Sequence, residues 1–125
     1  MGPELDLEEL RRSVLEELDS YRYEVPPNAL GRPMSDDWVA RQLGEMRAAL
    51  VDPEWRVVVI RESAGGPPLE VPEPRQCVLV AVDSSPGGYA ELYYDPLEGD
   101  FVLASGEPPE TFGVRGDAVG CFMAR

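Results

Sequence analysis

The sequence predicts an α+β domain in which two N-terminal helices pack on one face of a mainly antiparallel sheet of about five strands. Two observations support this class. Up to residue 51, apolar residues recur every three or four positions, which is the spacing of helices with one buried face. Beyond that point they gather in short β-branched runs such as VVVI at 57–60, which are typical of buried strands.

Both predicted helices begin at a recognisable cap. Asp6, followed by Glu9 three residues later, resembles a capping box and predicts a helix over about residues 7–22. Ser35 precedes two aspartates and predicts a second helix over about residues 36–51. A proline-rich segment, EVPPNALGRP, separates the two helices because proline interrupts helical hydrogen bonding.

The strands are predicted from short apolar or alternating runs separated by turn residues. The segment SSPGG predicts a hairpin turn, since glycine supplies the positive φ that tight turns need. The segment SAGGPPLEVPEP, rich in proline and glycine, predicts a polyproline-like excursion between the first two strands. We expect one domain over residues 1–125, with strands over about residues 56–61, 76–82, 89–94, 101–104 and 118–123.

The charge composition narrows the classes of partner. The chain has 24 acidic residues and 11 basic ones, all of them arginine, and its formal net charge is -13. Such a field repels phosphate backbones and anionic lipids, so we expect neither nucleic acid nor membrane as a partner. Residues 63–114 hold nine acids and one arginine, mostly in predicted loops, so a charged partner should be a basic protein.

Few kinds of catalytic chemistry remain open to this composition. The chain has no histidine and no lysine, which removes Ser-His and Cys-His pairs, Schiff bases and the phosphate-binding lysine of P-loops. Cys77 and Cys121 lie in apolar runs and read as reduced core residues, although Cys121 near Arg115 and Asp117 remains the best nucleophile candidate. The sequence therefore favours a non-enzymatic protein with no cofactor. The N-terminus lacks the pattern of a secretory signal, which predicts a cytoplasmic location.

One strand and its flanking turns hold the candidate binding residues. Alternation along the strand places Tyr89, Glu91 and Tyr93 on one face, and tyrosines are favoured at protein interfaces. The turn after it, DPLEGD, gathers carboxylates that suit a hard cation such as calcium. Glycines around Arg115 predict a turn, and its charge suits an ion pair. The candidate partner-binding residues are Tyr89, Glu91, Tyr93, Asp95, Glu98, Asp100 and Arg115.

Two hypotheses of different class follow. The first is a small acidic protein-binding domain that engages a basic partner, in the manner of an immunity protein or an antitoxin. The alternative is a small-ligand or divalent-metal-binding domain that uses the three strand residues and the 95–100 turn. The sequence leaves open the oligomeric state and whether the second face of the sheet is exposed.

Overall fold

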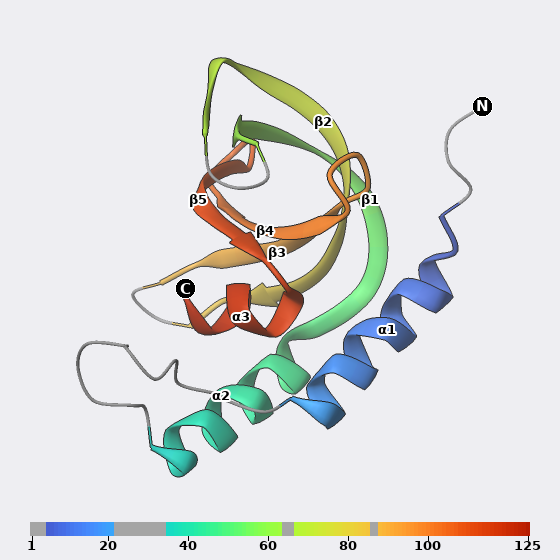
Figure 1. Cartoon of the computed structure of the whole chain (residues 1–125), viewed down its shortest axis with the longest axis vertical. Coiled ribbons are helices and arrows are strands. Elements are labelled where there is room, and N and C mark those ends of the chain that lie inside the picture. The colour runs from blue at the N-terminus through green and yellow to red at the C-terminus, as the bar shows by residue number, and fades with distance from the viewer. Residues whose placement is uncertain (1–4, 22–34, 64–66, 86–87) are drawn as a thin grey trace.

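The computed structural model describes residues 5–21, 35–63, 67–85 and 88–125. The α+β class is confirmed, because the described residues contain five paired strands together with helices at both ends of the chain (Figure 1). In chain order the elements are α1 (Leu7–Ser20), α2 (Asp36–Ala49), β1 (Leu50–Glu62), β2 (Pro68–Asp83), β3 (Ala90–Asp95), β4 (Asp100–Ser105), β5 (Glu110–Gly116) and α3 (Ala118–Met123).

The five strands close into a barrel in the order β1-β2-β3-β4-β5. Successive strands pair antiparallel, whereas β1 and β5 meet in parallel through a single residue pair, Val59 and Glu110. The sequence predicted a sheet but not its closure. Closure gives the sheet an inner and an outer surface in place of two open faces.

Two apolar clusters occupy the two surfaces of the barrel. The inner cluster consists only of strand residues and surrounds Tyr93, which is fully buried. The other cluster joins the outer surface of β2, β3 and β4 to the helices, with Leu92 and Leu103 meeting Leu10, Val14 and residues of α3. Alternate residues of one strand thus serve different clusters, as the period-2 pattern of a strand requires.

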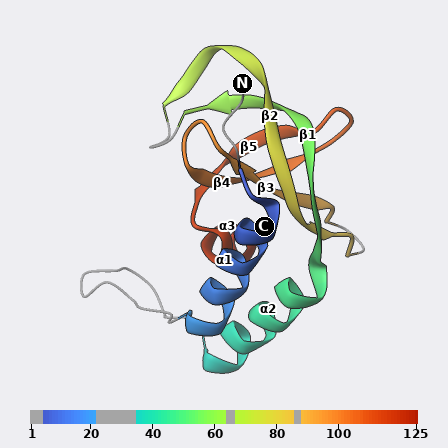
Figure 2. The same cartoon turned by 90° about the vertical axis from the view of Figure 1, so that its right-hand side faces the viewer.

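The helices gather beside the barrel, and α3 lies between it and the two N-terminal helices (Figures 1 and 2). Both predicted caps are present. The Asp6 carboxylate accepts hydrogen bonds from the backbone N–H groups of Glu8 and Glu9, and the Ser35 hydroxyl accepts one from Trp38. Since α2 ends at Ala49, β1 follows without a linker. Residues 22–34, which include the proline-rich segment, lie outside the described residues.

The predicted strand over residues 118–123 is wrong, because this segment forms helix α3. The Asp117 carboxylate caps it by accepting a 2.8 Å hydrogen bond from the N–H of Gly120. Glu17 of α1 accepts two more, 3.3 Å from the N–H of Ala118 and 2.6 Å from that of Val119. Burial is the main reason that the pKa of Glu17 is raised above its ordinary value. Three N–H groups in the first turn of this helix therefore donate to carboxylates. One of the two carboxylates, that of Glu17, comes from a distant part of the chain.

Two loop predictions also need correction. The fifth strand is β5, and it occupies the segment in which a turn around Arg115 was predicted. Gly113 lies inside this strand and Gly116 is its last residue, and both have positive φ. The predicted polyproline excursion is instead largely the first half of β2, in which Pro74 lies opposite Val59. Proline is tolerated there because this half pairs only with β1, so one edge of the strand needs no donor.

The hairpin predicted at SSPGG joins two strands that do pair antiparallel, with Asp83 opposite Ala90. Pro86 and Gly87 themselves lie outside the described residues.

The capping of α3 predicts a specific cost for losing the Asp117 carboxylate. We expect Asp117→Ala to lower the free energy of unfolding by about 1 kcal/mol. Asp117→Asn removes the same charge but keeps a side-chain oxygen that can accept the hydrogen bond, so its free energy of unfolding should stay close to that of the unmodified chain. Urea denaturation followed by circular dichroism measures both values. Equal losses in the two variants would show that charge, and not the cap, stabilises this helix.

Candidate functional site

The seven candidate residues divide between two polar clusters at opposite ends of the β3–β4 hairpin. Residues opposite each other on neighbouring strands share a face, and Tyr93 lies opposite Leu79 and Val102 of the inner cluster. Glu91 and Asp95 flank Tyr93 at a spacing of two, so both belong to the same inner face. Glu91 lies near the end of the hairpin that leads to the β4–β5 turn, and Asp95 adjoins the β3–β4 turn. The candidates therefore form no single site.

The tyrosine cluster is built around the Glu91 carboxylate, which is 4% exposed. It accepts hydrogen bonds of 2.7 Å from the Tyr89 hydroxyl and 2.9 Å from the Tyr93 hydroxyl, and Arg56 lies 3.4 Å away. The hydrogen bond to Glu91 raises the pKa of Tyr89, and burial followed by the same carboxylate raises the pKa of Tyr93. Of the three predicted contact residues, Tyr89 lies just before β3 and reaches the surface, with 52% exposure, whereas Glu91 and Tyr93 lie on β3 and are buried.

The arginine cluster lies at the other end of the barrel and is a buried ion network. Arg115 Nη2 lies 2.9 Å from Asp95 and 2.6 Å from Asp100, and its Nη1 donates a 3.0 Å hydrogen bond to the carbonyl of Glu62. Arg75 donates a 2.6 Å hydrogen bond to the same oxygen of Asp95. Burial alone would lower the pKa of Arg115, but its hydrogen bonds to Asp100 and Asp95 more than offset this and raise it. One guanidinium thus connects β1, β3, β4 and β5.

These ion pairs argue against the alternative hypothesis that the 95–100 turn binds a divalent metal ion. Asp95 already has two guanidinium partners, Asp100 has one, and Glu98 lies 4.0 Å from Arg75. The described residues contain no group of three or more side chains able to hold a metal ion. A divalent cation in the 95–100 turn would have to compete with arginines that already neutralise its ligands.

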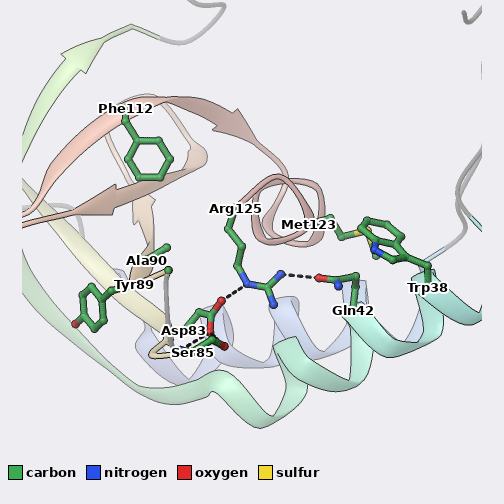
Figure 3. Close-up of a pocket in the computed structure, with 10 residues that line it drawn as sticks. Trp38, Gln42, Asp83, Ser85, Tyr89, Ala90, Phe112, Met123 and Arg125 are labelled. Carbon is green, nitrogen blue, oxygen red and sulfur yellow. Dashed lines mark hydrogen bonds and ion pairs between the residues drawn. The ribbon is translucent and has the colours of Figure 1, made fainter. Parts of the chain in front are cut away.

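Two aromatic side chains at the surface, Tyr89 and Phe112, are each about half exposed. Together they join three grooves. Both line the central groove, which has a volume of about 500 Å³ and is also bordered by Trp38, Asp83, Met123 and Arg125 (Figure 3). Tyr89 also lines the proline groove, bordered by Val57, Glu107, Pro108 and Pro109. Phe112 also lines the seam groove, between the end of β1, the start of β2, and β5, bordered by Glu62, Leu69, Glu70 and Pro72.

Arg125 shapes one wall of the central groove by linking α3 to α2 and β2. Its guanidinium pairs with Asp83 and donates a 2.6 Å hydrogen bond to the side-chain amide oxygen of Gln42 (Figure 3). It lies 2.6 Å from Glu45. It also stacks on Phe122, with 3.8 Å between its carbon and the ring centroid. Burial works against the charged form of Asp83, but hydrogen bonds from Ser85 and Arg125 lower its pKa below the ordinary value. This arginine is therefore already neutralised, and among the described residues that line the groove there is no free cation.

Sequence reasoning identified Tyr89 but missed Phe112, Arg125 and Glu62. Phe112 lies in a short segment after a proline pair for which no element was predicted, and nothing local distinguishes Arg125. Glu62 did leave a signal, because it continues the alternation of Val58 and Ile60 on the inward face of β1, where an acid is out of place.

Within the described part of the chain, no helix is both long and apolar enough to cross a membrane. Comparison with models of protein families, with curated proteins and with solved structures finds no match to this chain.

The arginine cluster predicts a large loss of stability when its central cation is removed. Arg115→Met should lower the free energy of unfolding by about 3–5 kcal/mol, because it leaves Asp95 buried with one partner fewer and leaves Asp100 with no ion pair among the described residues. The matched control is Arg61→Met, which breaks only the exposed pair with Glu110 and should cost less than about 1 kcal/mol. Chemical denaturation measures both, and equal losses would contradict a closing role for Arg115.

The cysteines predict a negative result with thiol reagents. Burial, followed by nearby acids, raises the pKa of both Cys77 and Cys121 to about 12, so the folded protein should hold almost no thiolate at pH 8. A chromogenic disulfide reagent should therefore label neither cysteine until urea unfolds the chain. Stoichiometric labelling of Cys121 in the folded protein at pH 8 would revive the cysteine nucleophile hypothesis.

Proposed function

We propose that this protein is a small acidic binding domain that engages a basic protein partner through the surface centred on Tyr89 and Phe112. The observation that carries the proposal is that two half-exposed aromatic side chains connect three adjoining grooves. Aromatic residues at the centre of such a surface are the usual anchors of protein interfaces, because they bury a large area at a small entropic cost.

Charge supports a basic partner over a neutral one. The chain has a formal net charge of -13. The arginines that line the proline and central grooves, Arg56 and Arg125, are each paired with two carboxylates, whereas Glu107 of the proline groove has no cation among the described residues. A basic protein would be attracted over long range and oriented towards this side of the barrel.

The clusters inside the barrel support binding over catalysis. The carboxylates of the tyrosine and arginine clusters are occupied by hydroxyl or guanidinium partners, and these contacts stabilise the barrel. The analogy with immunity proteins and antitoxins adds one expectation, that binding occludes the partner and lowers the partner's own activity. We also propose that the encounter takes place in the cytoplasm.

A small-ligand function has one supporting observation, the central groove, whose volume of about 500 Å³ falls in the range of ligand sites. Its aromatic wall would pack against a planar compound. The two functions differ in the size of the partner, so the capture experiment below separates them.

The test is affinity capture from lysate of the source cell, using the folded protein and matched surface variants as baits. The double variant Tyr89→Ala/Phe112→Ala should lower the amount of captured partner at least about tenfold, because it removes both anchors. Glu91 keeps Tyr93 and Arg56 as partners in this variant, so the fold should persist. The retained proteins should be basic and should elute as salt is raised.

The control bait is Leu97→Ala, which removes a 70% exposed apolar side chain from the β3–β4 turn, away from the three grooves. It should capture the same proteins as the unmodified chain. If the double variant captures as much as this control, the proposed surface is wrong, and if no basic protein is enriched by any bait, the basic-partner function is wrong.

A further inference from the structure

The seam groove contains a buried carboxylate that has no partner. Glu62 is 7% exposed, and its Oε1 is inaccessible to solvent and makes no hydrogen bond. It lines the groove together with apolar residues from the start of β2 and from β5. A buried carboxylate without a hydrogen bond or a cation carries a large desolvation cost, so a protein rarely keeps one without a use.

The groove exists because β1 and β5 separate at this point of the barrel. Their ladder consists of one residue pair, Val59 and Glu110. Beyond it, the N–H of Arg61 donates to the side-chain hydroxyl of Thr111 instead of a backbone carbonyl, and the carbonyl of Glu62 accepts from Arg115. Side chains hold the seam here, which leaves room beside β5 that a regular ladder would fill.

The nearby cations are engaged elsewhere. Arg115 donates to the backbone carbonyl of Glu62 but directs its charge to Asp95 and Asp100. Arg61, which also lines the groove, lies 3.2 Å from Glu110. Within the described residues the Glu62 carboxylate therefore has no ion pair. With Glu70 at the rim, the groove carries two acids against one arginine that is already neutralised.

We propose that the seam groove binds an arginine side chain of the basic partner, with its guanidinium against the Glu62 carboxylate. This inference rests on the proposed function and names the chemistry by which the surface selects its partner. The apolar walls, Pro68, Leu69, Pro72 and Phe112, suit the aliphatic stem and the flat face of a guanidinium. The cation would supply the partner that Glu62 lacks, so the desolvation cost borne by the free protein is offset on binding.

Phe112 connects this groove to the rest of the binding surface, because the same ring also lines the central groove. An arginine in the seam groove would thus lie beside the aromatic anchor of the interface. Charged side chains that are desolvated next to such an anchor contribute far more to affinity and specificity than charges at a rim.

The experiment uses the full chain and two probe peptides, triarginine and the tricitrulline peptide of the same length, which keeps the shape and loses the charge. Binding is followed by NMR through the backbone amides of Glu62, Thr111 and Gly113. The two protein variants are Glu62→Gln and Glu70→Gln, which change the net charge equally on the same groove, the first at the buried acid and the second at an exposed one.

We expect triarginine to shift these amides and tricitrulline to leave them unchanged. Glu62→Gln should weaken triarginine binding at least about tenfold, and Glu70→Gln less than about threefold, because only the first removes the desolvated partner. Thermal unfolding of the free variants checks the fold, and Glu62→Gln should be at least as stable as the unmodified chain, since it removes an unpaired buried charge.

Equal weakening by the two variants, equal binding of the two peptides, or shifts confined to other surfaces would overturn the inference. The proposed function would survive such a result if capture of the basic partner still depended on Tyr89 and Phe112. Conversely, capture that ignores those two residues while triarginine still requires Glu62 would overturn the proposed surface and leave the arginine site in place.

Discussion

The fold depends on how the barrel is closed, and the contacts that close it are made by the guanidinium of Arg115. A five-stranded barrel needs its first and last strands to meet, yet β1 and β5 share one residue pair. Arg115 of β5 supplies what the ladder does not, by binding Asp95 of β3, Asp100 of β4 and the carbonyl of Glu62 on β1. Because the Arg115 guanidinium and the Asp95 carboxylate are buried, the network stabilises the barrel only when it is complete.

Closure also decides which side chains are exposed at the surface. It turns Tyr93 and Glu91 inward, where their polar atoms satisfy one another, and leaves Tyr89 at the surface as the exposed end of the same hydrogen-bonded cluster. The pairing between β1 and β5 is, by contrast, incomplete. Since side chains and not a ladder hold it, a groove opens there, and the inward-facing acid of β1 lies in its wall. Structure and candidate function therefore share one cause, the weak pairing of the terminal strands.

The sequence predicted what local patterns determine. The caps at Asp6 and Ser35, the buried stripes of the first two helices and the alternation along β3 all depend on neighbouring residues, and these expectations agree with the structure. It failed where distant residues decide. AVGCFM suits a strand or a helix equally well, and the N–H groups that make it a helix bind Glu17, a hundred positions away. Likewise, Arg115 could be marked for an ion pair, but its simultaneous contact with three strands depends on a closure that no local pattern encodes.

The acids of this chain act over two different distances. This difference explains why net charge alone says little about which class of partner the protein would bind. Exposed acids such as Glu70 and Glu107 contribute to a field that extends about a Debye length, which accelerates encounters with any basic surface and fades with salt. Glu62 acts only at contact, where low dielectric and the missing partner make the identity of the cation matter. Attraction through the first set selects for positive charge, and a fit at the second selects for one side chain in one place. Under the proposed function, a partner that satisfies both would present an arginine beside an apolar patch, which is a far narrower class than basic proteins in general.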